Sequence, residues 1–158
     1  MRRVLPIGAL LLAVVVAGAC RRSTGGGDTG TRTSPEAVVQ FLDAARARDL
    51  DQMSAVWGNA ARPTRDEVSR QELEQRLLVM ICLLRHDESR LGVASPGEAG
   101  RQVYRVELKQ GDKLATTTFT TVQNARTNRW FVEEFDPRPL RDFCSSPNAP
   151  VRPGSGRD

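Results

Sequence analysis

The sequence has few of the residues from which metal and catalytic centres are commonly built. Its 158 residues include one histidine, three cysteines and one tyrosine. His86 and Cys82 stand four residues apart, but one histidine and one cysteine do not complete a zinc site. No glycine-rich phosphate loop follows a predicted strand, and no Ser-His-Asp pattern is apparent. We therefore expect no metal and no cofactor, and we assign no catalytic residue.

The chain also lacks a basic excess in the part that is expected to fold. The full sequence has 23 Lys and Arg against 19 Asp and Glu. Between Ser34 and Asn148, however, it has 16 basic and 17 acidic residues, a net charge of −1, and no basic run. Because a nucleic-acid-binding domain needs a cationic face, we do not expect nucleic acid to be a partner.

One long apolar run stands at the amino terminus, and it predicts export. Met1, Arg2 and Arg3 give a positive start, and residues 4–19 carry no charge and end in small side chains. This is the layout of a secretory signal peptide. A helix that crosses a membrane needs roughly 20 apolar residues, and this run is shorter. We predict that residues 1–19 are a signal peptide.

The end of this run, Ala17-Gly18-Ala19-Cys20, resembles the lipobox of bacterial lipoproteins. The resemblance implies that Cys20 becomes the first mature residue and is acylated, with palmitate among the chains, so that it holds the protein on a lipid bilayer. An ordinary signal peptidase site would instead release a soluble protein with a free thiol at Cys20. We favour a lipid-anchored protein of the bacterial cell envelope, in the outer membrane and facing the periplasm or the surface.

Two low-complexity segments bound the central domain. Residues 20–33 join the anchor to a linker rich in Gly, Ser and Thr, which is typical of a flexible tether. Residues 147–158 contain three prolines and two glycines and are expected to form a disordered tail. The two cysteines between them, Cys82 and Cys144, predict a disulfide in an exported protein. Two separately buried thiols are the alternative.

Residues 34–146 are long enough for one domain, and their first half has helical periodicity. Ser34 as N-cap and Pro35 at the first helical position begin a helix. Its apolar stripe recurs at i, i+3, i+4 and i+7: Val38, Phe41, Leu42 and Ala45. Two further helices begin at pairs with capping-box spacing: Asp49 with Gln52, and Ser69 with Glu72.

The third of these helices, over "LEQRLLVMICLLRH" (residues 73–86), is expected to be the core helix. One side carries the regular apolar stripe: Leu73, Leu77, Met80, Ile81 and Leu84. Leu78, Val79, Cys82 and Leu83 fill much of the remaining surface. A helix that is apolar all round is usually buried, so we expect its second half to be enclosed on nearly every side.

After Gly92 the period of the pattern changes from 3.6 to 2, which predicts strands. In "RQVYRVELKQGDKLATTTFTTV" a turn at Gly111 and Asp112 aligns three pairs of residues on one face: Leu108 with Ala115, Val106 with Thr117, and Tyr104 with Phe119. "RLGVAS" and "NRWFVEEFD" predict a strand on either side of this hairpin. The fold class is therefore α+β, with amino-terminal helices packed on a curved antiparallel β-sheet meander.

At this point the chain resembles the NTF2-like superfamily, which includes SnoaL-like, ketosteroid-isomerase-like and cystatin-like domains. The resemblance rests on "SPEAVVQFLDAARARDLDQMSAVW" as the opening helix pair and on "NRWFVEEF" as the last strand. One departure is that residues 58–68 leave little room for the strand pair that many members carry after their early helices. The domain at residues 34–146 is then a reduced NTF2-like domain or a separate fold with a similar outline.

Members of this superfamily often bind small ligands in a cone between the sheet and the helices, but no family motif assigns such a role to a position here. From the strand pattern, the candidate pocket residues are Tyr104, Phe119, Trp130, Glu133 and Glu134. A carboxylate that faces an apolar pocket can serve as a base. The alternatives are a core role for Tyr104, and for the two glutamates a position at the rim or paired with an arginine.

Three functions remain open from the sequence. The favoured one is a non-catalytic envelope lipoprotein module that binds a partner protein or a small ligand through its sheet face or its cone. The second is a SnoaL-like isomerase or hydrolase that uses a pocket carboxylate such as Glu133 or Glu134. The third is a structural scaffold of an envelope complex.

Overall fold

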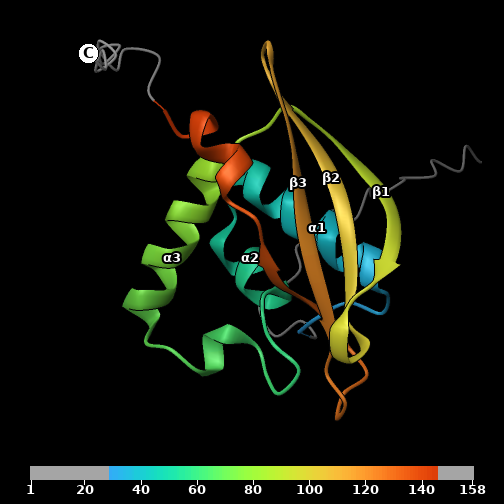
Figure 1. The fold of residues 1–158 in the computed structure, drawn as a ribbon. Coiled ribbons are helices and arrows are strands. Elements are labelled where there is room, and N and C mark those ends of the chain that lie inside the picture. The colour runs from blue at the N-terminus through green and yellow to red at the C-terminus, as the bar shows by residue number, and fades with distance from the viewer. Residues whose placement is uncertain (1–28, 146–158) are drawn as a thin grey trace, which may run out of the picture.

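The computed structural model describes residues 29–145 and has the α+β order expected from the sequence (Figure 1). The predicted signal peptide, the anchor Cys20 and the predicted tail lie outside the described residues. Three α-helices come first: α1 (Ser34–Ala47), α2 (Leu50–Val56) and α3 (Arg70–Leu83). Four strands follow: β1 (Glu88–Pro96), β2 (Gln102–Gln110), β3 (Lys113–Gln123) and β4 (Trp130–Phe135). Three short 3-10 helices connect them: η1 (Thr64–Asp66), η2 (Glu98–Gly100) and η3 (Arg138–Phe143).

The strands form an open antiparallel meander in the order β1-β2-β3-β4. All three side-chain pairs predicted for the central hairpin occur in its register, including Tyr104 opposite Phe119. Gly111 has a φ of 56° in the turn, a conformation that glycine adopts without strain. The hairpin prediction is confirmed because alternation and turn chemistry specify the same register.

Two of the three predicted helix starts are confirmed, and the first differs by one residue. Asp49 Oδ1 accepts a hydrogen bond from the Gln52 backbone N–H at 2.9 Å, and Ser69 Oγ accepts one from Glu72 at 3.3 Å. The N-cap of α1 is Thr33, so the prediction for Ser34 is wrong. Ser34 is buried, and its Oγ lies 2.6 Å from Thr121 Oγ1 of β3. A contact with the sheet has therefore replaced the local cap.

The main hydrophobic core lies between α1 and the inner face of the sheet (Figure 1). Phe119 of β3 lies at its centre, edge-on to Phe41 of α1 at 6.3 Å between ring centroids and stacked on Phe135 of β4 at 5.4 Å. The fully enclosed apolar side chains include Val38, Phe41, Met53, Val106, Leu108, Phe119 and Val132. Their packing closes the inner face of the sheet.

The free edge of β4 is covered, and the free edge of β1 is open. Thr31 and Trp130 exchange two backbone hydrogen bonds of 2.9 Å, and the Gly58 N–H donates to Val132 O at 3.0 Å. A Cβ at Gly58 would lie 2.8 Å from the carbonyl oxygen of Arg62, so this close approach requires glycine. On the other edge, every β1 residue except Leu91 is exposed.

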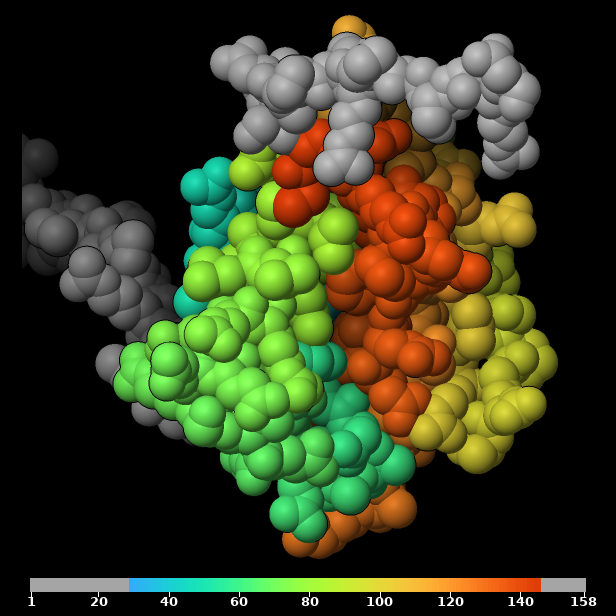
Figure 2. Space-filling model, turned by 60° about the vertical axis from the view of Figure 1, so that its left-hand side comes forward, coloured from blue at the N-terminus to red at the C-terminus, as the bar shows by residue number. Residues whose placement is uncertain are grey.

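The expectation that the second half of α3 is buried nearly all round is wrong. Within α3 only Leu77 is fully buried, and Leu84 follows just after the helix. The side chains of Leu78 and Val79 are 57% and 59% exposed. The reason is that α3 packs on α1, α2, η1 and η3 from one side only, at the outside of the helical layer (Figure 2).

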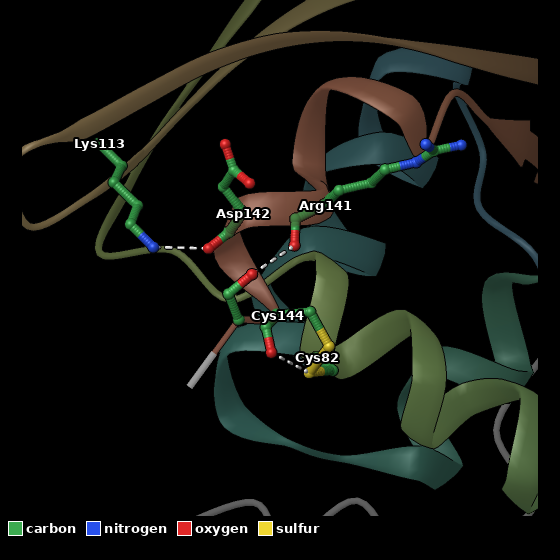
Figure 3. The surroundings of a disulfide bond; sticks show 6 residues. Cys82, Lys113, Arg141, Asp142 and Cys144 are labelled. Carbon is green, nitrogen blue, oxygen red and sulfur yellow. Dashed lines mark hydrogen bonds between the residues drawn. A yellow bond between two sulfur atoms is a disulfide. The ribbon is translucent and has the colours of Figure 1, made fainter. Parts of the chain in front are cut away.

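A disulfide joins Cys82 near the end of α3 to Cys144 after η3, as the cysteine count predicted. It links positions 62 residues apart in the sequence. Lys113 Nζ of the central hairpin donates to the carbonyl oxygen of Asp142 at 2.5 Å on the other side of η3 (Figure 3). η3 is therefore held both to α3 and to the sheet. Among residues 29–145, no helix combines the length and the apolar character needed to cross a bilayer.

The aromatic centre of the core generates a first prediction. Phe119→Ala should lower the free energy of unfolding by about 3–5 kcal/mol, because it removes a fully buried ring and leaves a cavity. Urea denaturation followed by circular dichroism measures this change. The neighbouring Thr118 is exposed, and Thr118→Ala should cost less than about 1 kcal/mol. Equal effects of the two variants would contradict this account of the core.

Candidate functional site

The structure brings two of the five predicted pocket residues together and leaves three elsewhere. Tyr104 and Phe119 are register partners on the inner face of the sheet, 3% and 0% exposed. Trp130 and Glu133 are half-buried on β4, and Glu134 is exposed. The inner face is thus occupied by packed side chains at the position where the resemblance implied a cone.

The hydroxyl of Tyr104 is bonded within the fold. Its Oη lies 2.9 Å from Ser34 Oγ and 2.9 Å from Gln102 Oε1. Ser34 Oγ in turn lies 2.6 Å from Thr121 Oγ1, which donates to Gln102 O at 3.3 Å. This chain of hydrogen bonds ties the start of α1 to β2 and β3. It satisfies the buried hydroxyls, as buried polar groups require.

Glu133 is bound by an arginine that the sequence analysis did not single out. The Arg101 guanidinium contacts both carboxylate oxygens of Glu133, through Nε and, at 2.7 Å, through Nη2. This bidentate hydrogen bonding, and then the negative charge of Glu133, raise the pKa of Arg101 above its usual value. Both side chains are about one quarter exposed, at 32% and 21%. The pairing with arginine, one of the alternatives from the sequence, is therefore the arrangement found for Glu133.

Glu134 and its neighbours belong to the outer face of the sheet. Glu134 lies opposite Thr120 in the register, and their side chains are 3.5 Å apart. Most side chains of β2 and β3 on this face are polar: Arg105, Glu107, Lys109, Thr116, Thr118 and Thr120. Leu114, opposite Lys109, is an exposed apolar residue of the same face. No helix of the described residues covers this face, whereas α1 packs against the opposite one (Figure 1).

His86 supports no metal site within the described residues. It is only 4% exposed, and its Nδ1 donates to the carbonyl oxygen of Leu84 at 2.7 Å. Across residues 29–145, His, Cys, Asp and Glu side chains form no group of three that could hold a metal ion. Nε2 of His86 has no hydrogen-bond partner in this part of the chain. The histidine satisfies a carbonyl near the end of α3, where carbonyl groups lack helical partners.

The surface has a wide hollow of about 820 Å³ between α2, η1 and α3. Its charged lining is nearly balanced: Arg48, Arg65 and Arg70 against Asp49, Asp51, Asp66 and Glu74. Two of these groups already pair with each other, because Arg70 Nε donates to Glu74 at 2.8 Å. A balanced lining selects neither an anion nor a cation, so this hollow carries no specific chemistry.

Comparison with known proteins adds no further information. No protein-family model matches the sequence, and no curated protein and no solved structure matches it. The function is therefore inferred from the residues and from the fold.

The internal bonding of Tyr104 generates a second prediction. Tyr104→Phe should lower the free energy of unfolding by about 0.5–1.5 kcal/mol, because the ring still packs but Ser34 loses a buried hydrogen bond. Tyr104→Ala should cost about 3–5 kcal/mol through the added cavity. Both values come from urea denaturation. If the hydroxyl faced an open pocket instead, Tyr104→Phe would leave stability unchanged or raise it.

Proposed function

We propose that this chain is a non-catalytic, lipid-anchored binding module of the bacterial cell envelope. Its partner is a protein, and the binding surface is the outer face of the sheet. The observation that carries this proposal is the contrast between the two faces. The inner face is filled by side chains such as Phe41 and Phe119, whereas the outer face around Thr118 is uncovered in the described part of the chain.

The domain behind this surface is, in our proposal, a reduced NTF2-like domain. The order of helices followed by an antiparallel meander, with helices on one face, supports it. The reduction lies after α2, where many members carry a strand pair. Here Gly58 and Pro63 form a single isolated bridge, and the chain then enters η1. The binding function is thus assigned to the sheet face, because the inner space is closed.

The paired state of Glu133 bears on the choice between binding and catalysis. A carboxylate base needs an unpaired, ionisable group beside its substrate. Glu133 has both oxygens on Arg101, and Glu134 is exposed on the outer face. Neither arrangement supports the use of a pocket carboxylate, so binding is the function we propose.

The anchor proposal rests on the sequence, and it limits how far the domain lies from the bilayer. The Gly30 N–H donates to Ala55 O at 2.7 Å, so the chain is fixed to the domain from this point onward. Nine residues lead from Cys20 to Thr29. Fully extended, such a segment spans about 30 Å. A domain tethered in this way stays close to the bilayer while different faces can turn toward it.

The lipid anchor is tested by metabolic labelling of the full chain in bacterial cells. We expect labelled palmitate on the protein and a mature chain that begins at Cys20 with its acyl chains, measured by mass spectrometry. Cys20→Ala should lose the label and the membrane association. The double variant Cys82→Ala, Cys144→Ala is the matched cysteine control and should keep the label. An unmodified amino terminus on the native protein would overturn the anchor proposal.

The binding surface is tested by site-specific photocrosslinking in native membranes. A photoreactive amino acid at Thr118, on the outer face of β3, should give one dominant crosslinked protein. The same amino acid at Gln40, an exposed position of α1, is the control and should give little product. Arg105→Glu should weaken the product at Thr118, because it reverses a charge beside that position in the register. Equal crosslinking from both positions would contradict the choice of surface.

A further inference from the structure

The outer side of α3 carries apolar side chains that are not buried in the core. Leu78 and Val79 are adjacent in the sequence and are 57% and 59% exposed. Ile81 and the disulfide-bonded Cys82 are half-buried beside them. Single exposed apolar residues are common on protein surfaces, but contiguous ones usually mark a contact with another molecule. Figure 2 shows that α3 lies at the surface with no other described element over it.

A small hollow next to these residues combines apolar and cationic side chains. It has a volume of about 250 Å³. The apolar part of its lining comes from Leu50, Leu78, Ile81 and Cys82. The only charged side chains in the lining are those of Arg48 and Arg85, and no acidic residue contributes. The hollow therefore suits a ligand with an apolar part and a negative charge.

The two arginines form no ion pair with another described residue of the domain. Within residues 29–145 neither Arg48 nor Arg85 forms an ion pair, whereas the neighbouring Arg46 pairs with Asp43 at 2.8 Å. The nearest acids in sequence, Asp49 and Asp87, each accept a backbone N–H, from Gln52 at 2.9 Å and from Gly111 at 2.7 Å. Among the described residues these two guanidinium groups therefore form no ion pair, although Arg48 also lines the larger hollow that contains Asp49 and Asp51, and both arginines lie near Asp87. Both can bind an external anion.

Arg48 also has an unusual backbone conformation. Arg48 ends α1 in the left-handed region, with a φ of 57° and a ψ of 34°. Glycine or asparagine is the usual residue at such a position, because other side chains are strained there. The backbone conformation therefore does not itself require arginine, although a cation is favourable at the C-terminal end of a helix.

We propose that this surface of α3 binds a bilayer that contains anionic phospholipid. Leu78 and Val79 enter the boundary between headgroups and acyl chains, and Arg48 and Arg85 bind lipid phosphates. A guanidinium is well suited to phosphate because its planar donors match the phosphate oxygens. This inference rests on the proposed lipid anchor, because a patch of this size binds weakly alone and stable attachment generally takes two signals.

The position of α3 in the fold explains what such docking achieves. α3 lies on the helical side of the molecule, and β1 and β2 lie on the opposite side (Figure 1). When α3 rests on the bilayer, β1 and β2 lie on the side of the domain that is remote from it. The docking then sets the orientation of the domain, and these strands are accessible from the envelope space.

The test uses the mature chain, residues 20–158, with Cys20→Ser, so that no acyl group contributes. Binding is measured by sedimentation with vesicles of phosphatidylcholine, with and without phosphatidylglycerol, at low and high salt. Without the anchor we expect weak but measurable binding, only to the vesicles with phosphatidylglycerol, and still weaker binding at high salt. Because the chain cannot be acylated, the result does not depend on whether Cys20 is an anchor in cells.

Variants with substitutions in the proposed membrane-binding surface, and a control variant outside it, test where the bilayer binds. Arg48→Gly and Arg85→Gln should each weaken binding about five-fold, as expected for one arginine at an anionic membrane. Arg48→Gly also relieves the left-handed position, so its stability should be unchanged or higher. The double variant Leu78→Gln, Val79→Gln should weaken binding about ten-fold or more. Arg105→Gln on the outer sheet face is the charge control and should change binding less than about two-fold.

Three outcomes would overturn the proposal. The first is equal binding to vesicles with and without phosphatidylglycerol. The second is no binding to either, or binding that the variants at Arg48, Arg85, Leu78 and Val79 leave unchanged. The third is a dimer in analytical ultracentrifugation that the Leu78→Gln, Val79→Gln variant dissociates, because the surface would then be an interface between two copies of the chain.

Discussion

The contact of Phe119 with Phe41 and Phe135 is the constraint on which the rest of the structure depends. It fixes α1 against the middle of the sheet, and it does so with side chains that fill the space between them. The hydrogen bond from Tyr104 to Ser34 closes the same space with polar groups that are satisfied internally. Because side chains of residues 29–145 fill the space between α1 and the sheet, we place the proposed binding on the outer surfaces.

The sequence predicted those elements whose cause is local. The turn at Gly111 and the alternation on either side of it determined the hairpin register, and the cap at Asp49 determined the start of α2. The cap expected at Ser34 failed because a partner distant in sequence, Thr121, competes for its hydroxyl. The pairing of Arg101 with Glu133 has no local signal either, because it joins residues 32 positions apart across separate elements. Tertiary partners of this kind cannot be read from spacing.

The error on α3 has a different physical origin. The apolar composition of a helix indicates how much free energy it gains when it is buried. It does not indicate how many neighbouring elements are present to bury it. In this domain α1 takes the place against the sheet, and α3 packs on the outside of the helical layer, where Leu77 and Leu84 are enclosed and Leu78 is not. The sequence alone indicated that these apolar side chains belong to the core, whereas in the structure they remain at the surface of α3.

The disulfide explains how α3 keeps its position with so few buried side chains. Full burial of Leu77 and Leu84 contributes about 1.5–3 kcal/mol each. In the chain-entropy description, a bond between Cys82 and Cys144 across 62 residues contributes about 4 kcal/mol by restricting the unfolded chain. The covalent link is thus comparable to the burial that it supplements. Because part of the stability of α3 comes from this link, Leu78 and Val79 do not have to be buried to hold the helix, and they remain available at the surface.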